Sequence, residues 1–380
     1  MPRIHWLGTG LSSIPGLRRL LKKKYDVFVW NRTLEKAQSL LGDLTENIFK
    51  FDFDELGQNI NSGDIVISML PASHHLDIAK LCLKENTNLV TSSYISREFQ
   101  ELNNDVIKKR LVFLNEVGLD PGIDHLMAHD LVKQYKESQN YENSNTIEFF
   151  SYCGGIPKKP NDFCYKFSWS PLGVLKALKS PAKSIEEFNP VETLRPWHNV
   201  SEHEIHSVQS EKFEVYPNRD SLPFINQYDF ENNWKLKKFV RGTLRNLGWK
   251  KAWQQIFQNI ENINIDNDYK KLENLSNELW DKYSYEEEEE DRVVLNVSLK
   301  ASQKRNVKFD RSYLLDAWGD KKYTAMARLV SIPIALAVEA ILKNKIPIGV
   351  SAAPKSSELV ADWLDEIKKE AQIFKFINKS

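Results

Sequence analysis

The sequence predicts an α/β fold, in which a doubly wound parallel sheet is followed by a second α+β domain with a helical appendage. Short apolar runs alternate with helical segments as far as residue 114, and the first apolar run ends in a glycine-rich turn. This alternation stops after residue 130. Regular alternation of strand and helix is typical of a parallel sheet with helices on both faces. We therefore place the first domain at residues 1–118.

The glycine-rich turn predicts a dinucleotide site. It reads GTGLSSIPG, from Gly8 to Gly16, and it lies between a strand at residues 3–8 and a helix at residues 17–24. Gly8 permits a tight turn, and Gly10 lets the backbone approach a pyrophosphate at the helix N-terminus. The third glycine of the G-x-G-x-x-G pattern is replaced by Ser13, so the context of the turn carries the prediction of a Rossmann-type domain.

The end of the second strand indicates which dinucleotide binds. Residues 25–30 form an apolar strand that ends in Asn31-Arg32-Thr33, and no acidic residue precedes Glu35. An NAD site usually has an acid here for the ribose hydroxyls, whereas an arginine suits the 2′-phosphate of NADP. Arg32 therefore favours NADP(H) over NAD.

The exit from the first domain gathers ionisable residues into a short stretch, NEVGLDPGIDHLMAH at 115–129. Asp120 begins a Pro-Gly turn, and His125 and His129 share a helix face if a helix follows the turn. Because α/β sheets place their chemistry at the carboxyl ends of strands, this stretch is a candidate site. The same residues are also compatible with an ordinary strand, turn and helix in which the aspartate caps the helix.

The second domain is expected at residues 119–330, with a helical insertion at about 249–283, and residues 331–380 are expected to form C-terminal helices that pack back on the first domain. Predicted strands and an apolar helix lie at 145–153, 212–216, 239–247, 292–300 and 324–342.

Composition limits the partners. Lys+Arg and Asp+Glu both number 52, so the chain lacks the basic excess expected of a nucleic-acid-binding protein. Three cysteines without a C-x-x-C pair predict neither a disulfide framework nor a zinc site, and no metal is expected from His198, His203 and His206. We find no signal segment and no stretch approaching the roughly 18 apolar residues of a membrane span. A cytoplasmic protein with no membrane partner is therefore expected.

Taken together, many segments resemble the saccharopine reductase family, the glutamate-forming, NADP-dependent saccharopine dehydrogenases. The resemblance runs in order through GTGLSSIPG, NRTLE at 31–35, VISMLP at 66–71, VTSSYIS at 90–96, NEVGLDPGIDH at 115–125, SYCGGIP at 151–157, YKFSWSPLGVL at 165–175, YPNRDSLPF at 216–224 and FVRGTLR at 239–245. It departs from the family locally, at Ser12-Ser13, at Ala72-Ser73-His74 and in the histidine-rich stretch 198–206. It implies interconversion of saccharopine with 2-aminoadipate 6-semialdehyde and L-glutamate, by hydride transfer between NADP(H) and a secondary amine or imine carbon.

The resemblance also implies roles for individual residues. Asp120 and Cys153 match the catalytic positions, where a carboxylate or thiol can move protons during imine formation and hydrolysis. Substrate contacts fall on Ser93, Tyr94, Arg219, Arg241, Gly242 and Thr243. Cofactor contacts fall on Gly8, Thr9, Gly10, Leu11, Ser12, Arg32, Thr33, Leu70, Ser92, Trp169 and Ser170.

Arginines suit this substrate because saccharopine carries three carboxylates. Two alternatives remain open, a carboxynorspermidine-type reductase, whose cationic substrate calls for acids in the pocket, and a non-catalytic nucleotide-binding relative. A homodimer is expected, although the residues do not fix the oligomeric state. Neither do they fix whether the reaction serves synthesis or breakdown of lysine.

Overall fold

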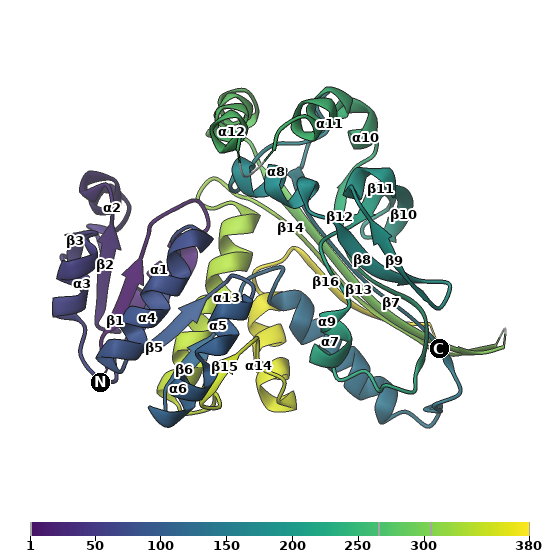
Figure 1. The fold of residues 1–380 in the computed structure, drawn as a ribbon, viewed down its shortest axis with the longest axis horizontal. Coiled ribbons are helices and arrows are strands. Elements are labelled where there is room, and N and C mark those ends of the chain that lie inside the picture. Colours follow the sequence, from purple (N-terminus) through teal and green to yellow (C-terminus); the bar gives the residue numbers. More distant parts are fainter. Residues whose placement is uncertain (1, 265–266, 305, 380) are drawn as a thin grey trace. The chain divides into compact units, whose positions relative to one another are not determined.

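The computed structural model describes residues 2–264, 267–304 and 306–379, and the chain divides into two compact units. The first unit comprises Met1–Leu126 and Ala327–Ile367, and the second comprises Met127–Met326 and Lys368–Ser380. Each unit is built on one sheet (Figure 1). The chain therefore leaves the first unit, completes most of the second, and returns to both near its C-terminus.

The first unit contains a seven-stranded sheet in the order β15-β6-β5-β4-β1-β2-β3, and all its strand pairs are parallel. The strands are β1 (Ile4–Leu7), β2 (Val27–Asn31), β3 (Ile48–Lys50), β4 (Ile65–Ser68), β5 (Asn88–Thr91), β6 (Val112–Leu114) and β15 (Gly349–Ser351). Every residue of β1 and β4 is buried, as expected for strands covered on both faces.

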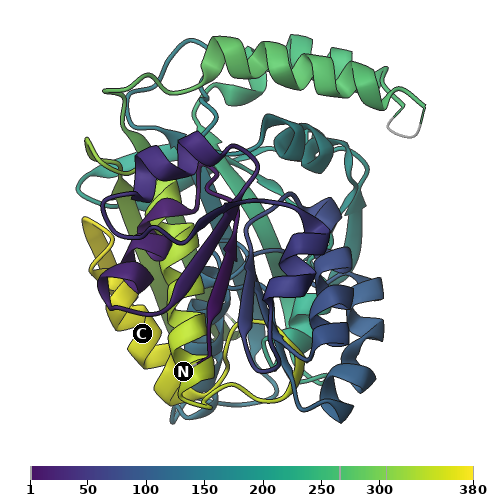
Figure 2. The same cartoon turned by 90° about the vertical axis from the view of Figure 1, so that its left-hand side faces the viewer.

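Helices lie on both sides of this sheet, with α4–α6 (blue) on one side and α13 (yellow-green) on the other (Figure 2). They are α1 (Ile14–Lys22), α2 (Leu34–Leu41), α3 (Phe53–Asn59), α4 (His75–Glu85), α5 (Arg97–Glu101), α6 (Asn103–Lys108), α13 (Ala325–Leu342) and α14 (Ser357–Lys368). Strand β1 pairs with both β2 and β4, so the strand order reverses beside β1, where a doubly wound sheet binds its ligand. The predicted doubly wound parallel sheet is confirmed.

Helix α13 packs closely against α1. The Gly16 N–H donates to Oγ of Ser331 at 2.8 Å, and a Cβ added at Gly16 would lie 2.0 Å from the Ser331 carbonyl oxygen. By length and composition α13 could cross a membrane, with a mean hydropathy of 1.9 over 18 residues, so our expectation that no stretch approaches a membrane span is wrong. Because 89% of this window is buried inside the structure, its apolar character matches that of a core helix.

The second unit contains a nine-stranded mixed sheet. Its main path is β10-β11-β12-β7-β13-β14-β16, and β8 pairs with β12 and β9. The strands are β7 (Thr146–Pro157), β8 (Ala182–Glu186), β9 (Asn189–Thr193), β10 (Ser201–His206), β11 (Ser210–Pro217), β12 (Lys235–Asn246), β13 (Asp291–Gln303), β14 (Asn306–Trp318) and β16 (Ile373–Asn378). The sequence did not predict β8, β9, β10, β14 or β16, and the expected helical character of the C-terminal segment ends at Lys368.

The helices of the second unit are α7 (Ile123–Lys136), which begins in the first unit, α8 (Pro171–Lys179), α9 (Pro223–Gln227), α10 (Trp249–Ala252), α11 (Gln254–Glu261) and α12 (Tyr269–Tyr283). Helices α8, α10, α11 and α12 surround an aromatic cluster with Trp249 and Trp253 at its centre, both fully buried. The helical segment expected at about 249–283 is therefore three consecutive helices.

Candidate active site

The turn after β1 has the geometry of a dinucleotide loop. Gly8 has φ +97°, and a Cβ there would lie 3.1 Å from the Met69 carbonyl oxygen, whereas a Cβ at Gly10 would meet no atom within 4 Å. The Thr9 N–H donates to Oδ1 of Asn31 at 3.0 Å. The Thr9 hydroxyl is buried and has no hydrogen-bond partner among the residues described, which leaves a donor for a ligand at this turn.

The N-terminus of α1 suits an anion. Its N-cap residue, Ser13, makes no side-chain capping hydrogen bond, and its first turn contains no acidic residue. The positive end of the helix dipole, with no acidic side chain in the first turn to oppose it, therefore favours a pyrophosphate here. Gly16, rather than residue 13, allows the close contact of α1 with a neighbouring helix, at Ser331 of α13. The sequence did not reveal this role of Gly16, because Ser331 is distant in the chain.

The other predicted cofactor residues of the first unit also follow carboxyl ends of strands. Arg32 is exposed directly after β2, Leu70 follows β4, and Ser92 follows β5. The amide of Asn31 donates to the Thr33 carbonyl at 2.7 Å and orders the chain beside Arg32. An exposed guanidinium at this point can fork the 2′-phosphate of NADP. The residues at the ends of these strands thus fit NADP(H).

Two loops of the first unit bring predicted site residues together. The Tyr94 hydroxyl, in the loop after β5, donates to Oδ1 of Asp120, in the loop after β6, at 3.0 Å. In the first of these loops Ser93 lies near a buried histidine, with Nε2 of His75 2.9 Å from the Ser93 hydroxyl and Nδ1 2.8 Å from the Ser68 hydroxyl. Burial lowers the pKa of His75 to about 4, so it is neutral at pH 7 and orients the two hydroxyls. Sequence reasoning did not assign His75 a role.

A second buried histidine lies beside Asp120. His125 is fully buried, with Nε2 3.0 Å from Oε2 of Glu116 and Nδ1 3.3 Å from Oδ2 of Asp124. Burial opposes the imidazolium, but the two carboxylates outweigh it and raise the pKa of His125 to about 9.

Cys153 and Arg241 lie on one face of the second unit's sheet. On neighbouring parallel strands, Cys153 of β7 pairs with Thr243 of β12, and Ser151 pairs with Arg241. Because side chains alternate along a strand, these four share a face. Cys153 and Arg241 are 8% and 4% exposed. The Arg241 guanidinium lies 4.0 Å from the centre of the Phe224 ring, which orients it.

Backbone contacts hold Arg219 beside this strand pair. Arg219 has φ +58° and lies just beyond β11, where Pro217 pairs with Gly242. The Asn218 N–H donates to the Arg241 carbonyl at 2.9 Å. A Cβ at Gly242 would lie 2.7 Å from the Tyr216 carbonyl, so glycine is required there. The structure thus brings together the predicted substrate residues of this unit.

Trp169 and Ser170 lie at the start of α8. The Ser170 hydroxyl caps the helix by accepting from the Gly173 N–H at 3.2 Å. A Cβ at Gly173 would lie 2.6 Å from the Trp169 ring, so the indole packs directly against the first turn of α8. Their predicted cofactor role stays a prediction.

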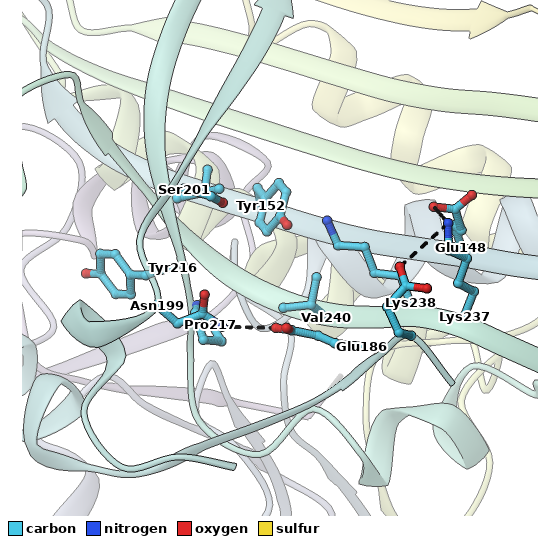
Figure 3. A pocket seen from close by; sticks show the side chains of 12 residues that line it. Glu148, Tyr152, Glu186, Asn199, Ser201, Tyr216, Pro217, Lys237, Lys238 and Val240 are labelled. Atoms are coloured by element: carbon cyan, nitrogen blue, oxygen red, sulfur yellow. Dashed lines mark hydrogen bonds and ion pairs between the residues drawn. The ribbon is translucent and has the colours of Figure 1, made fainter. Parts of the chain in front are cut away.

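A cavity of about 310 Å³ in the second unit is distinct from these residues (Figure 3). Tyr152 and Val240 line it, and they alternate with Cys153 and Arg241 on the same strands, so it opens on the opposite face of the sheet. His203 packs on that face, with Nε2 3.0 Å from Oδ1 of Asn296. Among the residues described there is no group of three metal-ligating side chains.

Comparisons with known proteins cover nearly the whole chain. Residues 4–114 match the saccharopine dehydrogenase NADP binding domain, and residues 118–373 match the saccharopine dehydrogenase C-terminal domain. The chain is 26% identical to the NADP⁺-dependent, L-glutamate-forming saccharopine dehydrogenase of Schizosaccharomyces pombe, over 97% of each chain.

Solved structures agree. The apo saccharopine dehydrogenase (L-Glu forming) of Saccharomyces cerevisiae superposes with a TM-score of 0.80 at 26% identity over the full length of both chains. A homospermidine synthase of Legionella pneumophila shares the fold, with a TM-score of 0.63 at 12% identity over 100% of this chain and 91% of that one. The expected cofactor, NADP(H), is confirmed by the domain match. The chain belongs to the saccharopine dehydrogenase family.

Proposed function

We propose that this protein is an NADP(H)-dependent oxidoreductase that interconverts saccharopine with 2-aminoadipate 6-semialdehyde and L-glutamate. The observation that carries the proposal is the similarity to a glutamate-forming saccharopine dehydrogenase over 97% of both chains. The site geometry agrees with it. The first unit offers a dinucleotide loop and a hydrogen-bonded acid, and the second offers a thiol with arginines on neighbouring strands.

In the oxidative direction, the carbon next to the secondary amine loses a hydride, which NADP⁺ would accept, the nitrogen loses a proton, and an imine is left. When bound, NADP(H) supplies the hydride chemistry. Water then adds to the imine carbon, the C–N bond breaks, and glutamate and the semialdehyde are released. These steps need a group that accepts a proton from the water and a group that returns one to the departing nitrogen.

Asp120 and Cys153 are the groups proposed for proton transfer. Asp120 accepts a hydrogen bond from the Tyr94 hydroxyl, so its carboxylate is oriented before substrate binds. Cys153 shares its strand face with Thr243 and Arg241, so its thiol lies on the same side of the sheet as a proposed substrate-binding arginine.

Arg219 and Arg241 are proposed to bind carboxylates of the substrate. The backbone bond between Asn218 and Arg241 fixes the segments that carry them. A pocket for the cationic substrate of a carboxynorspermidine-type reductase would place acids at these positions. The two arginines therefore favour a polycarboxylate.

A spectrophotometric assay tests the proposal. Purified protein with saccharopine is expected to reduce NADP⁺, and to reduce NAD⁺ much more slowly. Absence of reduction with both nucleotides overturns the proposed function, and a preference for NAD⁺ overturns the role of Arg32 alone. A second arm, with NADPH, a diamine and aspartate semialdehyde, tests the polyamine alternative.

A cytoplasmic location and a homodimer belong to the proposal as well. The location is supported by the low cysteine count, three in 380 residues without a C-x-x-C pair, which suits a reducing compartment. The homodimer is supported by the edge strand β16, where Phe376 is 44% exposed. Light scattering after size-exclusion chromatography measures the mass of the protein in solution and decides whether it is a homodimer.

A further inference from the structure

Two loops of the first unit carry the proposed acid and its phenol partner. Tyr94 lies in the loop after β5, and Asp120 in the turn after β6. Their hydrogen bond, 3.0 Å between the Tyr94 hydroxyl and Oδ1 of Asp120, joins the tips of the two loops. Its geometry depends on what holds each loop in place.

A buried carboxylate holds each loop by its backbone. Oε1 of Glu116 accepts from the Ile95 N–H at 2.9 Å, and the Glu116 N–H donates to the Ser93 carbonyl at 3.1 Å. Oδ1 of Asp124 accepts from the Gly122 N–H at 2.7 Å. Glu116 has φ +56°, a conformation that is uncommon for a residue with a side chain and that is maintained only by its surroundings.

His125 links these two carboxylates through the second oxygen of each. Its Nε2 faces Oε2 of Glu116, and its Nδ1 faces Oδ2 of Asp124. Only the imidazolium can donate from both nitrogens at once. A continuous path therefore runs from the Ile95 N–H through Glu116, His125 and Asp124 to the Gly122 N–H.

We propose that His125 is a positioning residue, an imidazolium that fixes the loop of Tyr94 and the turn of Asp120 relative to each other. The inference rests on the proposed function only in assigning proton transfer to Asp120. His125 does not act on substrate itself. It sets the geometry in which the Asp120 carboxylate meets the Tyr94 hydroxyl.

Two substitutions separate the two halves of the link. His125→Asn keeps a donor near the position of Nδ1, so it preserves the bond to Asp124 and removes the bond to Glu116. His125→Gln keeps a donor near Nε2 and does the reverse. Hydrogen exchange of the full chain is expected to speed up at least tenfold at Ile95 in the Asn variant and at Gly122 in the Gln variant.

The kinetic arm uses saccharopine and NADP⁺. Both variants are expected to lower kcat at least tenfold, to change the KM for NADP⁺ less than twofold, and to raise the solvent deuterium isotope effect on kcat, because proton transfer becomes slower. An isotope effect is a ratio, so a smaller folded fraction does not alter it. A role in stability alone would leave it unchanged.

His5→Asn is the matched control. His5 is another fully buried histidine of the same unit, with Nε2 3.2 Å from Oδ2 of Asp64. This variant is expected to lose stability while keeping the wild-type isotope effect and the wild-type exchange at Ile95 and Gly122. If the His125 variants do not fold, Glu116→Gln and Asp124→Asn keep the acceptors for the loops, remove the pairing with His125, and are expected to raise the isotope effect.

The proposal is overturned if the variants show wild-type exchange at both amides, or a wild-type isotope effect with kcat within twofold. If the wild-type protein does not oxidise saccharopine, the proposed function fails, and the exchange measurements still decide whether His125 links the two loops.

Discussion

The buried charge after the Asp120 turn of the first unit is surrounded by partners, whereas on the Cys153 face of the second unit's sheet some buried polar atoms have none among the residues described. His125 contacts two carboxylates, each of which also accepts a backbone N–H. In the second unit, Arg245 follows Arg241 and Thr243 on the same face of β12 and is 5% exposed. Among the residues described, its Nε and the hydroxyl of Ser151 have no hydrogen-bond partner.

Buried polar atoms without partners cost folding free energy, so they persist where another requirement maintains them. Ser151 and Arg245 lie on the strands that carry Cys153 and Arg241. The comparison indicates that the first unit fixes the turn of Asp120 through the pairing of His125 with its two carboxylates. The strand face of Cys153 in the second unit keeps hydrogen-bonding capacity for a polar ligand. Substitutions in the two regions should therefore fail in different ways.

The largest effect is expected where the pairing is broken. Glu116→Ala removes one partner of His125 and the acceptor for the Ile95 N–H, and it should lower the free energy of unfolding by about 3–5 kcal/mol. Urea denaturation measures this loss. A loss below about 1 kcal/mol would mean that the first unit does not depend on its internal pairing.

A change of pH should separate the contributions of His75 and His125, two of the buried histidines of the first unit, to the free energy of unfolding. The pKa of His125 is raised from 6.5 to about 9, so its stabilisation is complete below pH 6.5 and is lost as the pH rises through 9. The pKa of His75 is lowered to about 4, so its contribution is complete above pH 6.5 and is lost as the pH falls towards 4. Each contributes about 3 kcal/mol.

Unfolding free energies measured from pH 4 to pH 10 check both signs. His125→Asn should flatten the alkaline side of the profile, and His75→Asn should flatten the acidic side. The opposite assignment would contradict the pairing described for His125.

In the second unit, the expected loss is in substrate binding. Arg219→Ala should raise the KM for saccharopine about 10- to 100-fold, because a charge-assisted hydrogen bond contributes about 1.5–3 kcal/mol. The KM for NADP⁺ and the melting temperature should change little. A larger effect on NADP⁺ than on saccharopine would remove Arg219 from the substrate site.

The smallest effect on the fold is expected at Arg245. Arg245→Met removes a buried charge and keeps most of the volume, so the free energy of unfolding should change by less than about 1.5 kcal/mol in either direction. Urea denaturation beside Glu116→Ala gives the direct comparison. Equal losses in the two variants would show that both regions are stabilised in the same way.

The sequence predicted the first unit's sheet better than the second's for a physical reason. Parallel strands buried on both faces read as continuous apolar runs, as in β1 and β4. Strand β14 mixes polar and apolar residues, and β16 is a short segment at the chain end that pairs with β14. The pairing of β16 depends on β14, which is far away in the chain, so a local sequence pattern does not reveal it.

The candidate site likewise contains features that the sequence predicted and features that it missed. The glycine turn and the Asp120 turn were visible because turn residues have local signatures. The link through His125 was not visible, because it requires the left-handed backbone of Glu116 and a contact with Ile95 in another loop. Which residues touch substrate and cofactor stays a prediction until the variants are measured.

The contact between Gly16 and Ser331 has a consequence for synthesis on the ribosome. Helix α1 emerges early, but the helix against which it packs is translated only after nearly all of the second unit. The last strand at one edge of the first sheet, β15, comes later still. The nucleotide-binding unit therefore completes its packing near the end of translation, and nascent chains that stop before α13 should expose the face of α1 to chaperones.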